Sequence, residues 1–396
     1  MPDRKSKDVF TPNNKVNIVR GGADYFNLLE EIINGAQYTL HLQTYIYDED
    51  ETGEKIAEAL INAAYRNVNV YLLLDGYASQ NLSKEFIYRL RNAGVNFRFF
   101  NPFFKSEYFY LARRLHHKVI VADSTIGIVA GINVSNRYND IGETKAWLDW
   151  AAYVEGIICK ELNNTCERIW KRQFLYTPPA KLKNKIIVPE FEPGCEVRVR
   201  RNDWVMKKID ITRTYKQIFR ISQKEVLVMT SYFWPPKRLL KAMARASARG
   251  VVIKLVLSGN ADVPFNRYAE EFLYAFLFRN NIEVYEYQPN ILHGKVTVCD
   301  GEWYTLGSYN LNNISAFASV EMNLDIRDKL TAEWLRSHIN EIIENDCIRI
   351  TNDSYRANTN PIKQFAYFIS YNFIHFMFYL FTFYFEQKKR NKAKHP

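Results

Sequence analysis

Stretches with strand-like and helix-like hydrophobic spacing alternate along the chain, and the same order of stretches occurs twice. Short apolar runs predict buried strands, and apolar residues three and four positions apart predict amphipathic helices between them. Strands that alternate with helices indicate an α/β fold with crossover helices. The matched stretches of the first and second half are residues 38–47 and 225–234, 53–64 and 236–247, 68–74 and 251–257, and 95–100 and 282–287.

This repeated order predicts two similar layered α/β half-domains instead of one large sheet. Residues 176–194 hold four of the chain's prolines and a cluster of lysines, which is typical of an exposed linker. We therefore expect a polar extension over residues 1–16, a first domain over 17–173, a linker over 174–202, a second domain over 203–350 and a C-terminal tail over 351–396.

One string of residues occurs in each half, after the last matched strand. Polar and apolar residues alternate from its histidine to its aspartate, which is the two-residue period of a strand. The histidine and the lysine then point to the same face, about 7 Å apart. A turn at the aspartate returns the chain through a second apolar strand, which brings the asparagine beside them. The strings are His116-x-Lys118-x4-Asp123-x6-Ala130-Gly131-x-Asn133 and His293-x-Lys295-x4-Asp300-x6-Gly307-Ser308-x-Asn310.

Two such strings supply what attack on a phosphodiester requires. The diester oxygens are negatively charged, so catalysis needs cations and hydrogen-bond donors, a nucleophile, and an acid for the leaving alkoxide. Lysine and asparagine side chains can hold the oxygens, small residues let backbone amides approach them, and histidine can act as nucleophile or acid. A single His-x-Lys is common at strand edges, whereas two matching copies favour a phosphoryl-transfer enzyme.

The doubled string resembles the signature of the phospholipase D superfamily at nearly every fixed position. Ala130 departs from it, because that family more often has glycine there, and one methyl group is tolerated where the backbone is not left-handed. The resemblance covers the chain from about residue 17 to residue 327 and is strongest towards bacterial cardiolipin synthases. The segments that carry it include residues 44–48, 74–76, 131–133, 232–235 and 307–311.

The resemblance implies two pseudo-symmetric α/β sandwich domains, with an active site at their interface that uses neither a metal nor a cofactor. One histidine attacks phosphorus to form a phosphohistidine, and the other acts as general acid and base. We assign these roles to His116 and His293, although the pseudo-symmetry leaves the order open. The other motif residues expected to hold the phosphate oxygens are Lys118, Lys295, Asn133, Asn310, Ser308, Gly131 and Gly307.

Four acidic residues receive two different interpretations. Asp149 and Glu321 lie on apolar strands downstream of the motifs, where the family has an acid that fixes the tautomer of a catalytic histidine. A structural salt bridge or a strand-end carboxylate is the alternative for this pair. Asp123 and Asp300 lie at turns, and we interpret them as structural residues that cap the hairpin.

The implied reaction moves a phosphatidyl group from one phosphatidylglycerol to the hydroxyl of another and releases glycerol, as in cardiolipin synthesis. A phospholipase D hydrolase and a phosphodiesterase or nuclease are the alternatives within the superfamily. No nucleic acid partner is expected, because positive charge concentrates at the C-terminus and no basic and aromatic module is evident. Five scattered cysteines show neither zinc-site nor disulfide spacing. Since one chain holds both motifs, a complete site requires no dimer.

The end of the chain indicates contact with a membrane. Residues 365–385 carry no formal charge, are rich in Phe and Tyr, and show polar residues at helical spacing. We predict a helix that lies in the membrane interface, with the following basic residues on anionic lipid. Packing against the protein core is the alternative, and a membrane span is less favoured. The predicted location is the bacterial cell membrane, peripheral or monotopic, with the catalytic body on the cytoplasmic side. The basic residues are Lys388, Lys389, Arg390, Lys392 and Lys394, in a chain of net charge +10.

Overall fold

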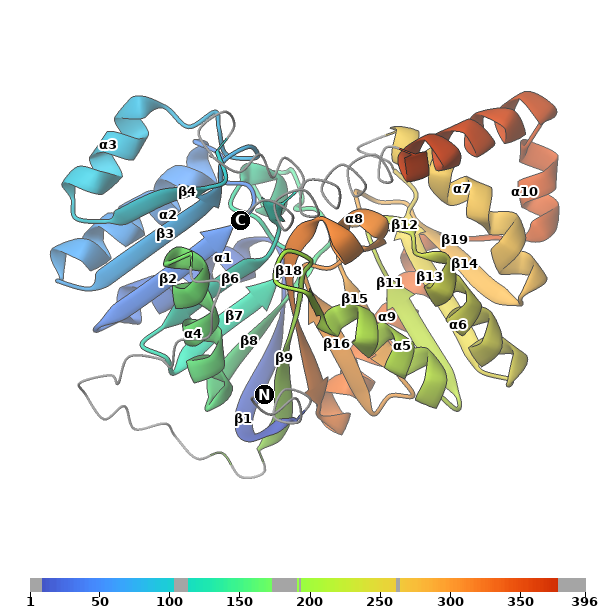
Figure 1. Ribbon diagram of the computed structural model, residues 1–396, viewed down its shortest axis with the longest axis horizontal. Helices are drawn as coiled ribbons and strands as arrows, with labels where there is room; N and C mark the ends of the chain where they lie inside the picture. Colours follow the sequence, from blue (N-terminus) through green and yellow to red (C-terminus); the bar gives the residue numbers. More distant parts are fainter. Residues whose placement is uncertain (1–8, 103–112, 173–190, 192–193, 261–263, 377–396) are drawn as a thin grey trace, which may run out of the picture.

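A single mixed β-sheet runs through both halves of the molecule in the computed structural model (Figure 1). The structure describes residues 9–102, 113–172, 191, 194–260 and 264–376. From the edge of the first half to that of the second, the strands are β4 (Asn96–Phe100), β3 (Asn69–Asp75), β2 (Thr39–Thr44), β6 (Lys118–Ala122), β7 (Ile126–Ala130), β8 (Trp150–Gly156), β1 (Thr11–Arg20), β9 (Cys195–Asp203), β18 (Ser319–Arg327), β16 (Trp303–Gly307), β15 (Val296–Cys299), β11 (Glu225–Met229), β13 (Val252–Ser258), β14 (Ile282–Tyr287) and β19 (Cys347–Ile350).

The two halves repeat the same arrangement of strands, which confirms the α/β prediction. Three parallel strands, β2, β3 and β4, lie beside the hairpin β6–β7 in the first half. In the second half β11, β13 and β14 lie beside the hairpin β15–β16 in the same way. The prediction of two half-domains instead of one large sheet is wrong in one respect, because β1 and β9 join the two sets of strands edge to edge.

This junction corrects two predicted domain boundaries. β1 begins at Thr11, so the expected polar extension 1–16 ends inside the sheet. β9 begins at Cys195, so the described part of the expected linker 174–202 is mostly a strand of the sheet. The sequence of β9 reads as polar because it contains Arg198 and Arg200, yet both are buried and lie 2.8 and 3.6 Å from Asp325 of β18. The strand was not predicted because its arginines are buried in ion pairs with a residue far away in the sequence. Residues 1–8, 173–190, 192 and 193 lie outside the described residues.

Helices cover both faces of the sheet. Along β6, Ile120 belongs to the core that contains α1, α2 and α3, whereas Val119 and Val121 belong to the core that contains α4, as the two-residue period of a strand requires. The core beneath α4 and α9 is continuous across both halves, so the halves form one body. The helices are α1 (Ala23–Gly35), α2 (Glu51–Tyr65), α3 (Lys84–Asn92), α4 (Ile158–Trp170), α5 (Asp210–Ile221), α6 (Lys237–Ala248), α7 (Pro264–Arg279) and α9 (Lys329–Asp346). Shorter elements are β5 (Arg114–Leu115), β10 (Lys208–Ile209), β12 (Phe233–Trp234), β17 (Leu311–Asn312), the 3₁₀ helix η2 (Asn136–Tyr138), α8 (Asn313–Phe317) and α10 (Asn352–Asn358), and residues 361–376 are also helical.

The aspartates at the hairpin turns have left-handed backbone angles, with φ of 50° at Asp123 and 54° at Asp300. The Asp123 carboxylate accepts hydrogen bonds from three successive backbone N–H groups at residues 37–39, each at 2.8 Å, where β2 begins. Asp300 accepts three in the same way at residues 223–225, where β11 begins. These contacts agree with a structural role, although each carboxylate caps the neighbouring strand and not its own hairpin.

Candidate active site

The two motif histidines lie just before β6 and β15, and the backbone of the other half holds each of them. The N–H groups of His116 and His117 donate to the carbonyl oxygen of Val320 in β18, at 3.0 and 2.9 Å. The N–H groups of residues 293 and 294 donate to the carbonyl oxygen of Leu148, both at 2.8 Å. The same contact therefore occurs twice, with the halves exchanged.

The residues that follow Val320 and Leu148 are the two predicted carboxylates. Glu321 Oε2 lies 3.0 Å from Nδ1 of His116, and Asp149 Oδ2 lies 2.7 Å from Nδ1 of His293. Both carboxylates are buried. A carboxylate at Nδ1 fixes the tautomer of the ring and directs Nε2 towards a substrate. The sequence predicts these two acids, but it does not show that each one serves the histidine of the opposite half.

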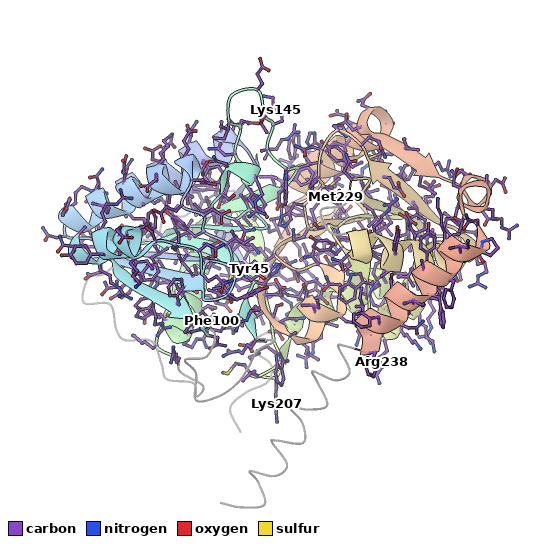
Figure 2. The ribbon with its side chains drawn as sticks, turned by 90° about the horizontal axis from the view of Figure 1, so that it is seen from above. Tyr45, Phe100, Lys145, Lys207, Met229 and Arg238 are labelled. Carbon is purple, nitrogen blue, oxygen red and sulfur yellow. The ribbon has the colours of Figure 1, made fainter. Side chains whose placement is uncertain are left out.

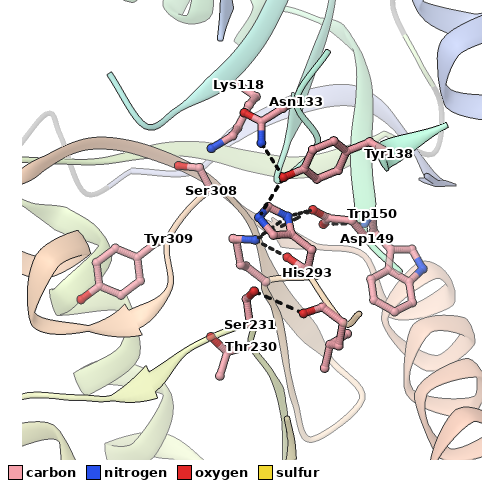
Figure 3. A network of polar contacts seen from close by, with 12 residues as sticks. Lys118, Asn133, Tyr138, Asp149, Trp150, Thr230, Ser231, His293, Ser308 and Tyr309 are labelled. Carbon is pink, nitrogen blue, oxygen red and sulfur yellow. Dashed lines mark hydrogen bonds and ion pairs between the residues drawn. The ribbon is translucent and has the colours of Figure 1, made fainter. Parts of the chain in front are cut away.

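Side chains of the two motifs share one site. Figure 3 shows Lys118 and Asn133 of the first half beside His293 and Ser308 of the second. Glu321 contacts both His116 and Ser308, and the hydroxyl of Tyr138 lies between the amide of Asn133 and the imidazole of His293. The structure therefore brings both strings together, as the sequence predicts.

Aromatic rings flank both imidazoles. The ring of Tyr45, which follows β2, lies 4.8 Å from that of His116, and Figure 2 places Tyr45 near the middle of the molecule, where the two halves meet. The rings of Tyr138 and Trp147 lie 5.0 and 6.0 Å from that of His293. Each imidazole therefore has at least one aromatic ring as a direct neighbour.

Burial sets the protonation of the site. It lowers the pKa of both His116 and His293 below the ordinary histidine value, so the free imidazoles are neutral near pH 7. It raises the pKa of Asp149 to about 7, and the His293–Asp149 pair therefore favours a single shared proton. It also lowers the pKa of Lys118 to about 7. The ammonium groups of Lys118 and Lys295 donate to the carbonyl oxygens of the two histidines, the first at 2.6 Å.

The small motif residues contact the carboxylates or the strand that carries them. A Cβ atom at Gly131 would lie 2.4 Å from Oδ2 of Asp149, and one at Gly307 would lie 2.3 Å from a carbonyl oxygen of β18. The hydroxyl of Ser308 donates to Glu321. The sequence predicts that these three residues bind phosphate, whereas their contacts in the free protein place and orient the two carboxylates.

The two halves differ at the Nε2 atoms. Asn133 Nδ2 donates to the hydroxyl of Tyr138 at 2.8 Å, and this hydroxyl lies 3.4 Å from Nε2 of His293. Nε2 of His116 has no hydrogen-bond partner among the described residues. The side chain of His116 is 18% exposed, against 8% for His293. His116 is therefore the more accessible imidazole. Asn310, the counterpart of Asn133, has a buried Oδ1 without a hydrogen-bond partner in the described part of the chain.

Sequence reasoning misses several residues that hold the site. The buried carboxylate of Asp75, at the end of β3, accepts from the N–H of Leu115 at 2.8 Å and lies 3.4 Å from Arg114, which fixes β5 directly before His116. Burial raises the pKa of Asp75. A carboxylate that ends a buried strand is the signal that could have identified it, because such a group requires partners. Tyr138 follows Asn133 by five residues in the sequence, but nothing in that spacing indicates its contact with His293.

Comparison with known proteins identifies the family. The family model described as "Cardiolipin synthase, PLD-like domain" matches residues 29–170 and 215–343. The chain belongs to this family. It is 33% identical over 352 residues to cardiolipin synthase B of Shigella flexneri, an alignment that covers 85% of this chain and 82% of that protein. It is 28% identical over 335 residues to the cardiolipin synthase of Geobacillus sp. (strain WCH70), with 80% and 65% covered.

A solved structure shares the fold of this phospholipase D-like cardiolipin synthase family member. The crystal structure of phosphatidylserine synthase from Haemophilus influenzae Rd KW20 superposes with a TM-score of 0.69 at 14% identity, covering 92% of this chain and 95% of that one. Family membership makes the chain an enzyme of the phospholipid-transfer type. Within the described residues, no helix is both long enough and apolar enough to cross a membrane.

The site of this family member predicts a fall in activity on the alkaline side near pH 7. Lys118 is cationic below its pKa of about 7 and neutral above it, and only the cation attracts a phosphate anion. In a pH profile of kcat/KM on a soluble phosphodiester, the alkaline limb of the curve reports the pKa of Lys118 in the free enzyme. A Lys118→Arg variant that retains activity keeps its charge, so its limb should move to higher pH. An alkaline limb at the same pH in both proteins would contradict this assignment.

Proposed function

We propose that this chain is a phosphatidyltransferase that converts two molecules of phosphatidylglycerol into cardiolipin and glycerol through a phosphohistidine intermediate. The observation that carries the proposal is the pair of imidazoles that face one site, each held by a carboxylate of the opposite half. Such an arrangement supplies a nucleophile and a general acid without further groups. Two relatives named as cardiolipin synthases over most of this chain support the substrate class.

His116 is proposed as the nucleophile because its Nε2 is accessible and lacks a partner among the described residues. Nε2 attacks phosphorus, the bond from phosphorus to the glycerol oxygen breaks, and that oxygen takes a proton from Nε2 of His293. A bound phosphate anion raises the pKa of His293, which allows it to carry this proton. Asp149 keeps the Nδ1 proton in place meanwhile.

The second half-reaction reverses the proton movement. The hydroxyl of a second phosphatidylglycerol gives its proton to Nε2 of His293 and attacks phosphorus, and the phosphorus–nitrogen bond to His116 breaks. In the free protein the hydroxyl of Tyr138 lies 3.4 Å from this Nε2, which is where an alcohol oxygen must lie in both steps. The Tyr138 hydroxyl shows that an O–H group can lie close to Nε2 of His293, and this supports the assignment of His293 as acid and base.

Lys118 and Lys295 are proposed to hold the non-bridging oxygens, together with the amide of Asn310. In the free protein the two ammonium groups donate to backbone carbonyl oxygens, and a phosphate anion is a stronger acceptor for them. The side chain of Asn133 accepts from the N–H of Ile46 and donates to the hydroxyl of Tyr138. We therefore propose that Asn133 positions Tyr138 beside His293, where the acceptor alcohol would bind.

Hydrolysis is the competing outcome, since water can replace the lipid hydroxyl at the same intermediate. The rings of Tyr45, Tyr138 and Trp147 beside the histidines support transfer, because they limit the access of water to the phosphohistidine.

Purified protein on phosphatidylglycerol vesicles should release cardiolipin and glycerol together, and His116→Ala and His293→Ala should each lower turnover by roughly 10⁴-fold or more. The measurement follows cardiolipin, phosphatidic acid and glycerol in one reaction. Phosphatidic acid as the sole lipid product would contradict transfer and identify a phospholipase D hydrolase. Cleavage of plasmid DNA without any lipid product would identify a nuclease.

We also propose that the helix over residues 361–376 docks on the surface of an anionic membrane. One side of this helix packs on the protein, where Tyr371 stacks on Phe272 of α7 with ring centroids 4.6 Å apart. Apolar side chains dominate the exposed surface of the helix, at Ile362, Phe365, Phe368, Ile369, Phe373 and Phe376, with Lys363, Gln364 and Asn372 between them. Aromatic side chains favour the headgroup boundary. The basic residues within 388–394, for which contact with anionic lipid is predicted, lie outside the described residues. They follow this helix in the sequence, and their charge complements anionic lipid.

This helix also contacts the segment that directly follows the second motif. His375 lies 3.2 Å from the side-chain amide of Asn313, which is three residues after Asn310. Docking of the exposed apolar face on a membrane would therefore hold the lipid surface next to the proposed phosphate site. That placement suits an enzyme whose two substrates are both lipids.

A Phe365→Asp/Ile369→Asp variant should bind phosphatidylglycerol vesicles roughly tenfold or more weakly, because two apolar side chains no longer enter the interface. Sedimentation with vesicles measures the binding, and hydrolysis of a soluble diester should stay unchanged. Leu330→Asp/Trp334→Asp is the matched control, since this exposed apolar pair has the same spacing on α9. Equal vesicle binding by both variants would refute the docking surface.

A further inference from the structure

A basic cavity lies between α5 and β9, on a part of the molecule that the proposed reaction does not use. Its volume is about 710 Å³, and α5 lies beside β9 on the near face of the sheet in Figure 1. The two residues directly before β1 and the end of β18 complete the lining. Its lining residues are Val9, Phe10, Glu196, Arg198, Arg200, Arg213, Lys216, Gln217, Arg220 and Arg327.

The lining carries six cationic side chains and one carboxylate, Glu196. Lys216 and Arg220 are exposed, lie one turn apart on α5, and form no ion pair with another described residue. Arg213 and Arg327 are exposed and each pairs with one carboxylate, the half-buried Asp210 at 3.5 Å and the exposed Glu196 at 3.3 Å, and pairs of exposed cations of this kind are weak enough to exchange for a ligand. Like charges gathered in one hollow repel each other, so the site favours an anion.

Arg198 and Arg200 are the buried cations of the lining, and the half-buried ring of Phe10 lies between Arg198 and the exposed Arg327. The guanidinium of Arg198 lies 4.3 Å from the centre of the Phe10 ring, and that of Arg327 lies 3.9 Å from the same ring. Arg198 also donates to Asp325 at 2.8 Å and to Gln217 at 3.0 Å. These contacts fix the directions of the planar guanidinium groups, which lowers the entropy lost when they bind a ligand.

The cavity is separate from the catalytic centre. Arg327 lies six residues along β18 from Glu321, a distance of about 20 Å at the usual rise of a strand. The register agrees, because Glu321 pairs with Asn202 whereas Arg327 pairs with Glu196 at the other end of β9. A ligand here cannot be the phosphate on which the histidines act.

We propose that this cavity binds a compact anion that carries two or more phosphate groups. Arginine side chains present paired N–H donors that match phosphate oxygens, and several of them suit a ligand with several phosphates. The volume lies within the range of small-molecule sites. A soluble oligophosphate and the headgroups of anionic lipid share this chemistry, and the experiment distinguishes them.

The test uses calorimetric titration of the whole protein with tripolyphosphate, and sedimentation with phosphatidylglycerol vesicles. The variant is Lys216→Glu/Arg220→Glu, which reverses two exposed charges without disturbing the core. Its matched control is Lys241→Glu/Arg245→Glu, because these exposed residues have the same types and the same spacing on α6. Hydrolysis of a soluble diester, measured on both, shows that the catalytic centre is intact.

For a soluble ligand, wild-type protein binds tripolyphosphate, the α5 variant binds it roughly tenfold or more weakly, and the α6 control matches wild type. The catalytic lysines can bind phosphate as well, and that binding is unchanged in both variants. For lipid headgroups, only vesicle binding falls, and only in the α5 variant. Equal losses in the two variants would show nonspecific charge attraction, and no loss in either assay would show that nothing binds; each of these results overturns the proposal.

Discussion

The structure depends on two carboxylates, each of which binds the motif histidine of the opposite half. Glu321 holds the imidazole of His116, and Asp149 holds that of His293. The residue before each carboxylate accepts the backbone N–H of the same histidine. Neither half therefore holds its own motif histidine without the other half. Because a buried carboxylate without a partner is costly, these contacts also stabilise the association of the halves.

The continuous sheet makes these contacts possible. β1 and β9 connect the two sets of strands, so that β18 of the second half reaches β5 of the first. The core beneath α4 and α9 extends across the same boundary. The shared sheet and core place the two histidines relative to each other, and burial holds both imidazoles neutral. The small residues of the motifs contribute by leaving space for Asp149 and for β18.

Much of this arrangement follows from sequence, because duplication makes the pattern visible twice. The strands of the matched stretches and the two hairpins lie where hydrophobic period and spacing predict them. The structural role of Asp123 also follows from its place at a turn. What sequence does not show is long-range partnership. β9 is concealed by arginines whose partner, Asp325, is more than a hundred residues away, and the contact of Tyr138 with His293 crosses the boundary between the halves.

We propose that two histidines from different halves act on one phosphorus atom in different roles. The most direct test of this proposal is single-turnover cleavage of phosphatidyl-p-nitrophenol, whose leaving group needs no proton. His293→Ala should release about one equivalent of nitrophenolate and retain the phosphatidyl group on His116, detected by mass spectrometry, because the intermediate forms but is not resolved. His116→Ala should show no burst. A burst in His116→Ala, or none in either variant of an active enzyme, would contradict the claim.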